Sequence, residues 1–266
     1  MIVKQIQSVQ NPLIKSLVVL REKSKARKQS NTFIIEGKRE IDLALQGGYQ
    51  IKQLVVCKKL LVADFDESNV PAQEYIEVAV EVYQKLAYRA STEGVLAVVF
   101  QKLKTLKDLV FQNSHPLILV AEAPEKPGNI GAMLRTADAA GVDAVLLANP
   151  KTDLYNPNII RSSVGCLFTN QVVTGTTNEI LEYLKEQKIT TFSAALKEDS
   201  EYYHQQDFTK ATAIIMGTEA VGLSEEWLEN CDHKIIIPML GKIDSMNVSV
   251  AAGILIYEAK RQRNFK

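Results

Sequence analysis

Short continuous runs of apolar residues recur through the second half of the chain, and stretches with helical spacing separate them. Residues 117–121, 144–147, 190–194, 213–216 and 234–237 have the length and composition of buried strands. Helices are predicted at residues 130–140, 178–187, 224–230 and 247–263. Such alternation predicts an α/β fold in which helices cover both faces of a mostly parallel sheet.

The first hundred residues show the same mixture on a smaller scale. Strands are predicted at residues 33–35, 54–57, 75–78 and 95–100, and helices at 11–28, 37–46 and 80–87. A polar stretch at residues 101–116 separates the two blocks. We therefore expect a first domain of residues 1–105 and a second of residues 106–266. The first is predicted to be a small α/β domain, and its sequence holds no obvious catalytic cluster.

Three loops of the second block combine glycine with polar residues just beyond predicted strands. In the first, APEKPGNIGAMLRTADAAG, Asn129 stands at the expected helix N-cap and Arg135 lies within a helix of small and apolar residues. Burying an arginine there is costly unless it faces a partner, and an arginine that reaches solvent is the alternative. In the second, IIMGTEAVGLSEEW, a turn explains Gly217 but not Glu219, and Ser224 is a good cap.

The third loop, within IIIPMLGKIDSMNVSVAAGILIYEA, carries more polar residues than a helix start requires. Asp244, Ser245 and Asn247 are all plausible caps, and one is enough. The surplus suggests a ligand. Parallel α/β sheets bind ligands beyond the carboxyl ends of their strands, which is where all three loops are expected.

Composition excludes several other classes. The chain has 266 residues, 46% hydrophobic and 23% charged, with equal numbers of basic and acidic groups. Its apolar runs are shorter than the roughly 20 residues of a membrane span. Its first residues lack a signal-peptide pattern, so a cytoplasmic protein is expected. The three widely spaced cysteines, Cys57, Cys166 and Cys231, predict buried small side chains and neither a metal site nor a disulfide framework.

Charge is distributed unevenly although its total is zero. Residues 1–40 hold nine basic and three acidic groups, a net charge of +6. Such a segment is suited to binding nucleic-acid phosphates, and a solvated helix face is the alternative.

The segments PGNIGAMLRTADAAG, IIMGTEAVGLS and IPMLGKIDSMNVSVAAGILIYE resemble, in the same order, the three motifs of the SpoU/TrmH family of RNA ribose methyltransferases. NTFIIEGKREIDLAL and STEGVLAVV are similar to the family's RNA-binding domain, an α/β fold like that of a ribosomal protein. The resemblance implies a C-terminal deep trefoil knot, a homodimer formed by the C-terminal domain, and S-adenosylmethionine bound by the knot loops. No metal is implied.

Position by position, the family's catalytic residues fall on Asn129 and Arg135 in the first motif, Glu219 in the second, and Ser245 and Asn247 in the third. Its cofactor contacts fall on Gly217, Ile237 and Met246, of which the last often is leucine in the family.

The implied reaction transfers a methyl group to a ribose 2′-oxygen, and in similar enzymes the first-motif arginine is held responsible for activating that oxygen. A guanidinium is effectively always protonated. We therefore expect Arg135 to bind a substrate phosphate and stabilise the developing alkoxide, while an RNA phosphate or water takes the proton. Glu219 and Asn129 are expected to orient Arg135 and the loops, and Ser245 and Asn247 to shape the cofactor and ribose site.

Ribosomal RNA, 23S rRNA first, is the expected substrate, because the N-terminal block is similar to domains of ribosomal RNA enzymes. Transfer RNA stays open, and so does a related knotted enzyme that modifies a base. A non-catalytic RNA-binding or ribosome-assembly protein is a further alternative. Its signature would be the loss of motif residues, and this sequence retains them.

Overall fold

The computed structural model describes residues 3–88, 93–218 and 221–265. The chain forms two compact units: Met1–Lys102 with Asp153–Thr169, and Leu103–Thr152 with Asn170–Lys266. The chain first passes from one unit to the other after Lys102, close to the expected boundary after residue 105. The expected second domain of residues 106–266 is not continuous, because residues 153–169 return to the first unit.

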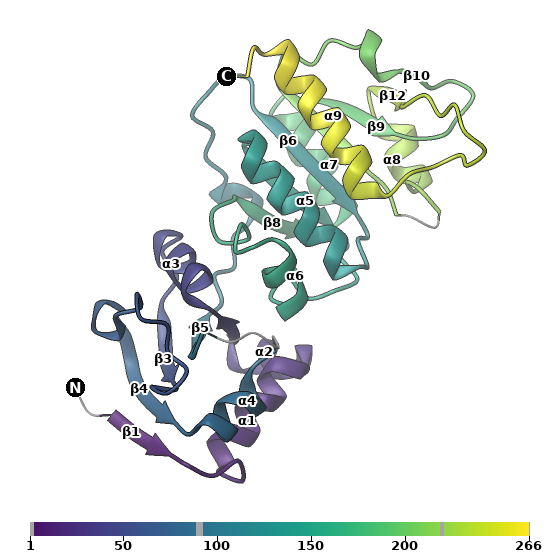
Figure 1. Cartoon of the computed structure of the whole chain (residues 1–266). Helices are drawn as coiled ribbons and strands as arrows, with labels where there is room; N and C mark the ends of the chain where they lie inside the picture. The colour runs from purple at the N-terminus through teal and green to yellow at the C-terminus, as the bar shows by residue number, and fades with distance from the viewer. Residues whose placement is uncertain (1–2, 89–92, 219–220, 266) are drawn as a thin grey trace. The chain divides into compact units, whose positions relative to one another are not determined.

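The first unit is built on a mixed five-stranded sheet with strand order β1-β4-β3-β5-β2 (Figure 1). Its strands are β1 (Val3–Ile6), β2 (Thr32–Glu36), β3 (Ile51–Val56), β4 (Ala72–Val78) and β5 (Val95–Phe100). Strands β1 and β3 run parallel to β4, whereas β5 runs antiparallel to β2 and β3. Strand β2 is buried at every position, which fits a sheet covered on both faces.

Helices α1 (Pro12–Glu22) and α4 (Val80–Leu86) pack on one face of this sheet, where Ile14, Leu17 and Val82 are buried. The single helix expected at residues 11–28 is instead two, α1 and α2 (Ser24–Ser30), because the extended backbone of Lys23 separates them. Helix α3 (Lys38–Gln46) follows β2.

Residues 153–169 pack against the first unit and include helix α6 (Pro157–Ser162). Asp153 forms an ion pair with Arg27 at 2.5 Å, and both side chains are almost fully buried. The ring of Tyr155 stacks on Phe33, with 4.2 Å between ring centroids. Burial raises the pKa of the Tyr155 hydroxyl, which donates a hydrogen bond to the carbonyl of Lys102. This segment is therefore part of the first unit's core.

Seven parallel strands form the sheet of the second unit within the described chain, in the order β10-β12-β9-β11-β6-β7-β8. The strands are β6 (Leu117–Glu122), β7 (Ala144–Ala148), β8 (Val172–Gly175), β9 (Thr190–Ala194), β10 (Glu201–Tyr202), β11 (Thr212–Met216) and β12 (His233–Ile236). The predicted α/β fold with a mostly parallel sheet is confirmed.

Helices cover both faces of this sheet. Helices α5 (Pro127–Ala140) and α9 (Val248–Gln262) lie side by side on one face (Figure 1). Helices α7 (Thr177–Glu186) and α8 (Glu225–Asn230) cover the other, where Trp227 joins the core with Ile215 and Val120. None of the described helices is long and apolar enough to cross a membrane.

Candidate functional site

A cavity of about 500 Å³ opens at the carboxyl ends of β6 and β11. From β6 the chain runs to β7 and β8 on one side, and its later strands β9 and β11 lie on the other. Ligands bind at such switch points in open α/β sheets. The cavity is lined by Ala121, Glu122, Ala123, Pro124, Glu125, Lys126, Asn129, Met133, Lys151, Gly217, Thr218, Val221 and Val248.

The wall next to β6 begins with an unusual backbone turn. Ala123 has a left-handed conformation with φ 43°, which is uncommon for a residue other than glycine. Its N–H donates to the carbonyl of Ala148, so β6 and β7 end together. Lys151 follows β7, and its N–H donates to the carbonyl of Pro124. Strained residues of this kind concentrate at functional sites.

The described parts of the second motif, residues 217–218 and 221–224, lie close together. Thr218 and Gly222 exchange backbone hydrogen bonds of 2.9 and 3.1 Å. A Cβ on Gly217 would lie only 2.3 Å from the carbonyl carbon of Gly222, so this close approach requires glycine. Glu219, predicted as a catalytic residue, lies outside the described residues.

Ser224 stands at the N-cap position of α8, but its side chain makes no capping hydrogen bond within the described chain. Its hydroxyl donates instead to Oε1 of Glu122 at 2.6 Å, and its N–H donates to Oε2 of Glu122 at 2.8 Å. The predicted capping role of the Ser224 side chain is therefore wrong.

The first and third motifs meet through two asparagines. Helix α5 begins at Pro127 after an N-cap at Lys126, so Asn129 lies in the first turn and is not the cap that we expected. Its Oδ1 accepts a hydrogen bond from Nδ2 of Asn247 at 3.2 Å. Asn247 caps α9, because its Oδ1 accepts from the N–H of Ser249 at 2.9 Å.

Arg135 is exposed on α5 and lies outside the described lining of the cavity. Six residues turn a helix by about 240° beyond a full turn, so Arg135 and Asn129 point from different faces of α5. Within this chain Arg135 therefore faces solvent, which was the alternative to an arginine buried against a partner. Asn129 was expected to orient both Arg135 and the loops. Its described contact is with Asn247 of the third loop, so in this chain it orients a loop and not Arg135.

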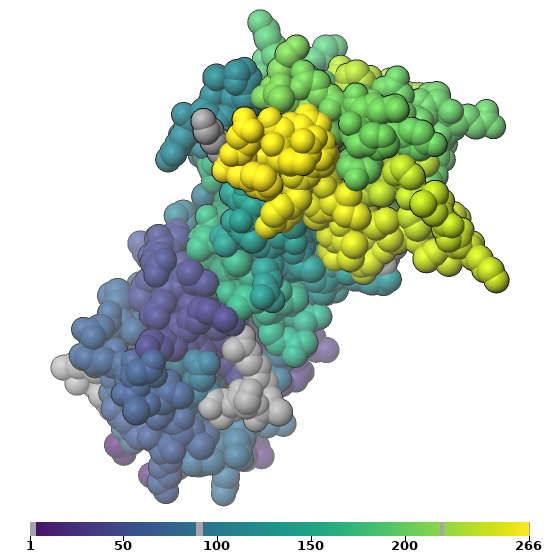
Figure 2. Space-filling view, turned by 45° about the horizontal axis from the view of Figure 1, so that its top comes forward, coloured from purple at the N-terminus to yellow at the C-terminus, as the bar shows by residue number. Residues whose placement is uncertain are grey.

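The remaining predicted residues also lie outside the described lining. Ser245 is exposed and its hydroxyl donates to Asp244 at 3.1 Å, while Ile237 and Met246 are half-buried. They belong to the loop between β12 and α9, which projects from the second unit (Figure 2). Its Leu240 is 98% exposed.

Sequence reasoning missed several cavity residues, above all Glu122, Lys126, Met133 and Lys151. Glu122 carried a signal, because a charged residue ends the otherwise apolar strand sequence LILVAE. The two lysines and Met133 carried none, since lysines in loops and methionines in helices are common. Of the cysteines, Cys57 is buried as predicted, whereas Cys166 and Cys231 are only half-buried.

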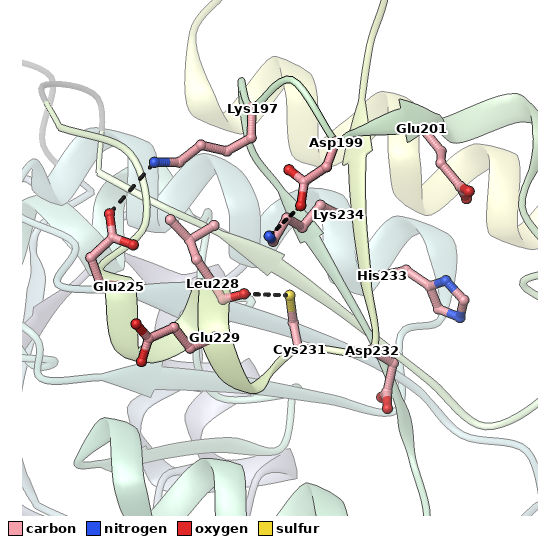
Figure 3. Close-up of a pocket in the computed structure, with 10 residues that line it drawn as sticks. All are labelled: Lys197, Asp199, Glu201, Glu225, Leu228, Glu229, Cys231, Asp232, His233 and Lys234. Carbon is pink, nitrogen blue, oxygen red and sulfur yellow. Dashed lines mark hydrogen bonds and ion pairs between the residues drawn. The ribbon is translucent and has the colours of Figure 1, made fainter.

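A second hollow, of about 530 Å³, lies beside α8 and β12 and is lined largely by charged groups (Figure 3). Lys234 pairs with Asp199 at 2.6 Å, and Lys197 with Glu225 at 3.5 Å. The hydrogen bond from Lys234 holds the pKa of Asp199 below its usual range. Asp232 accepts two hydrogen bonds from β9. Five acidic residues and two lysines line this hollow, and both lysines are already paired. The cavity at β6 and β11 adds apolar surface to its polar groups and is the better ligand site.

That cavity is suited to S-adenosylmethionine. Its volume falls in the range of about 300–1,000 Å³ of small-molecule sites. Ala121, Met133, Val221 and Val248 supply apolar surface, and the loop at Gly217 presents backbone closely to the cavity. Adenosine and a methionine chain need this combination of apolar contact and backbone polar groups.

Comparison with known proteins defines the class. The model of the SpoU rRNA Methylase family matches residues 116–257, and that of an MRM3-like substrate binding domain matches residues 11–97. The first match spans more than half of the chain. The chain therefore belongs to the SpoU rRNA methylase family, and the family prediction made from the three loops is confirmed.

Individual relatives match over nearly the whole chain. The 23S rRNA (guanosine(2553)-2′-O)-methyltransferase RlmP of Bacillus subtilis is 31% identical, over 97% of this chain and 99% of that enzyme. A crystal structure of an RNA 2′-O ribose methyltransferase has 38% identity and a TM-score of 0.83, covering 98% and 99%. An AdoMet-bound rRNA methyltransferase from Sinorhizobium meliloti has 27% identity and a TM-score of 0.87, covering 97% and 98%.

Proposed function

We propose that this protein transfers a methyl group from S-adenosylmethionine to a ribose 2′-hydroxyl of 23S rRNA. The observation that carries the proposal is the cavity at the β6–β11 switch point, where the first and second motifs line the wall and Asn247 of the third contacts Asn129. Relatives matched over the full chain, including the first unit, are named as rRNA enzymes. A function on transfer RNA is the second candidate.

S-adenosylmethionine supplies a methyl group on a positively charged sulfur, which makes it reactive toward an oxygen nucleophile. Gly217 allows close backbone contact with it, and Ile237 and Met246 add apolar contacts from the third loop. Asn129 and Asn247 hold the first and third loops together. Ser245 and Asn247 shape the ribose site, and Glu219 orients Arg135.

Arg135 binds an RNA phosphate and stabilises the negative charge that develops on the 2′-oxygen. Because its guanidinium cannot accept a proton at ordinary pH, the RNA phosphate or a water takes the hydroxyl proton. Since Arg135 and Asn129 point from different faces of α5, one copy alone does not bring them together. We further propose a homodimer through the C-terminal unit, in which Arg135 of one copy serves the cavity of its partner.

The surface of α9 supports a homodimer. Val250 and Tyr257 lie seven residues apart, on one side of the helix, and both are about half exposed. A stripe of exposed apolar residues on a helix is typical of an interface. In contrast, Ala252 and Leu255 on the same helix pack within this chain, since both are fully buried. We further propose that the C-terminal unit forms the family's trefoil knot and that the first unit has a ribosomal-protein-like fold.

The basic segment of the first unit offers fewer side chains to RNA phosphates than its net charge of +6 suggests. Arg27 is buried against Asp153, and Arg21 donates to carbonyls at the end of α4. Lys38 binds Asp64. The exposed amines that remain for phosphates are on Lys4, Lys15, Lys23, Lys25 and Lys28.

The test uses the purified protein, labelled S-adenosylmethionine, and ribosomal and transfer RNA from a strain that lacks the gene. Label in a 2′-O-methylnucleoside of 23S rRNA is expected. Label in tRNA would favour the second candidate, and label in a base would overturn ribose methylation. Absence of both label and S-adenosylmethionine binding would favour a non-catalytic RNA-binding protein.

Arg135→Ala should lower kcat by about 100-fold or more, because stabilisation of a developing oxyanion contributes that much to the rate. Its affinity for S-adenosylmethionine should stay within about twofold of the wild type. Lys185→Ala, on α7, is the control and should have wild-type activity. Normal turnover by Arg135→Ala would remove Arg135 from the mechanism.

A further inference from the structure

Glu122 is the last residue of β6 and is only 7% exposed, although it carries a carboxylate and lines the cavity. Both of its oxygens are engaged by a single residue, Ser224. The serine N–H donates to Oε2 at 2.8 Å and the serine hydroxyl to Oε1 at 2.6 Å. Two hydrogen bonds to one carboxylate fix both the distance and the orientation of residue 224.

This contact holds the far end of the second-motif loop, at Ser224, on β6. The near end is set by β11, because Met216 pairs with Ala121 of β6. Thr218 and Gly222 bridge the middle of the loop, and Ser224 returns the chain to Glu122. The described parts of the loop are therefore anchored to β6, through β11 at one end and through Glu122 at the other.

A capping function does not explain the arrangement. Helix α8 has only six residues, and the hydroxyl of Ser224 is directed to Glu122 rather than to its backbone N–H groups. Among the described residues, the side chain of Glu122 does not bond to its own strand. Its hydrogen-bond partner, Ser224, lies 102 residues further along the chain. Burial of a carboxylate is costly, so its retention at the cavity indicates a positioning function.

We propose that Glu122 is a positioning residue, which clamps residues 221–224 through Ser224 in the conformation that receives S-adenosylmethionine. The proposal rests on the proposed function, because it assigns the loop to that cofactor. A carboxylate suits the task because it only accepts hydrogen bonds, and Ser224 offers two donors. Glutamine at position 122 would keep one acceptor and remove the charge that strengthens both bonds.

The experiment measures S-adenosylmethionine affinity of the full chain by calorimetry, together with amide hydrogen exchange in residues 221–224. Glu122→Gln and Ser224→Ala should each weaken binding by about tenfold. Their kcat at saturating cofactor should stay within about threefold, and their amides should exchange faster in the free protein. Ser224→Ala is decisive for mechanism, since it keeps the carboxylate charge in the cavity.

Two matched variants serve as controls. Ser224→Thr keeps both donors, and Glu186→Gln removes an exposed carboxylate at the end of α7, outside the cavity lining. Both should bind the cofactor within about twofold of the wild type. Unchanged affinity in Glu122→Gln and Ser224→Ala would overturn the clamp, and so would an equal loss in all four variants. A wild-type protein that does not bind S-adenosylmethionine would overturn the proposed function instead.

Discussion

Replacing Asp153 by alanine tests whether residues 153–169 are an integral part of the first unit. Asp153 and Arg27 are 126 residues apart in sequence, and their side chains are 8% and 3% exposed. The alanine variant leaves the guanidinium of Arg27 buried without its counter-charge. Two of its hydrogen bonds, to the carbonyls of Leu20 and Arg21, remain.

The expected cost is large for a single substitution. Removing one partner of a buried ion pair costs about 3–5 kcal/mol, because the remaining charge loses its compensation. Removal of the Asp153 Oδ1 acceptor for the N–H of Tyr155 adds about 1 kcal/mol. For a unit of this size each kcal/mol lowers the melting temperature by about 3–5 °C. We expect the first unit to melt about 12–30 °C lower.

The chain offers a separate probe for each unit. Trp227 is its only tryptophan and is fully buried in the second unit. Tryptophan fluorescence therefore reports on the second unit, while far-UV circular dichroism reports on both. Asp153→Ala should produce an early transition by circular dichroism and leave the fluorescence transition nearly unchanged. Glu22→Ala, which removes the exposed ion pair with Arg21, is the control and should shift melting by only a few degrees.

Two results would refute this reasoning. A shift no larger than that of Glu22→Ala would mean that the pair does not hold the segment in place. An equal shift of the fluorescence transition would mean that the segment belongs to the second unit's cooperative structure. A double-mutant cycle with Arg27→Met completes the test, and its coupling energy should exceed about 2 kcal/mol.

Gly217→Ala should weaken S-adenosylmethionine binding about tenfold or more, because the new methyl group would overlap the backbone of Gly222 and displace the loop. Calorimetric titration checks this, and Gly128→Ala is the control, since a Cβ there has open space. Alanine at Lys15 and Lys25 should lower the salt dependence of rRNA binding, by about 0.7–0.9 in the log–log slope for each phosphate that is no longer neutralised. Filter binding at several salt concentrations measures the slope, and an unchanged slope would remove these amines from the interface.

Patterning predicted most of the sheet of the second unit, because buried parallel strands such as Leu117–Glu122 stand out as apolar runs. It missed β8, of four residues, and β1, whose sequence VKQI alternates too briefly to be distinctive. Helix boundaries failed where local chemistry was ambiguous. Asn129 is a good cap, yet Pro127 opens α5 two residues earlier, since proline is favoured in a first helical turn.

The candidate site was predictable in position but not in its contacts. Strand topology gathers loops at one edge of a parallel sheet, so Asn129, Gly217 and Asn247 were expected together and are near one another. Arg135 was expected there because it shares a motif with Asn129, and helical rotation places it on another face. Neighbours in sequence therefore need not share a site, even within one short helix.

Long-range polar contacts mark the limit of sequence reasoning in this chain. Glu122 with Ser224 and Arg27 with Asp153 each join segments more than 100 residues apart. A charge in an apolar context, as in LILVAE, signals that a buried partner must exist. It cannot identify that partner, because serine and aspartate occur in many loops and any of them could supply the hydrogen bonds. Only the fold selects one, and in both cases the selected contact fixes the position of a segment that the hydrophobic pattern leaves undetermined.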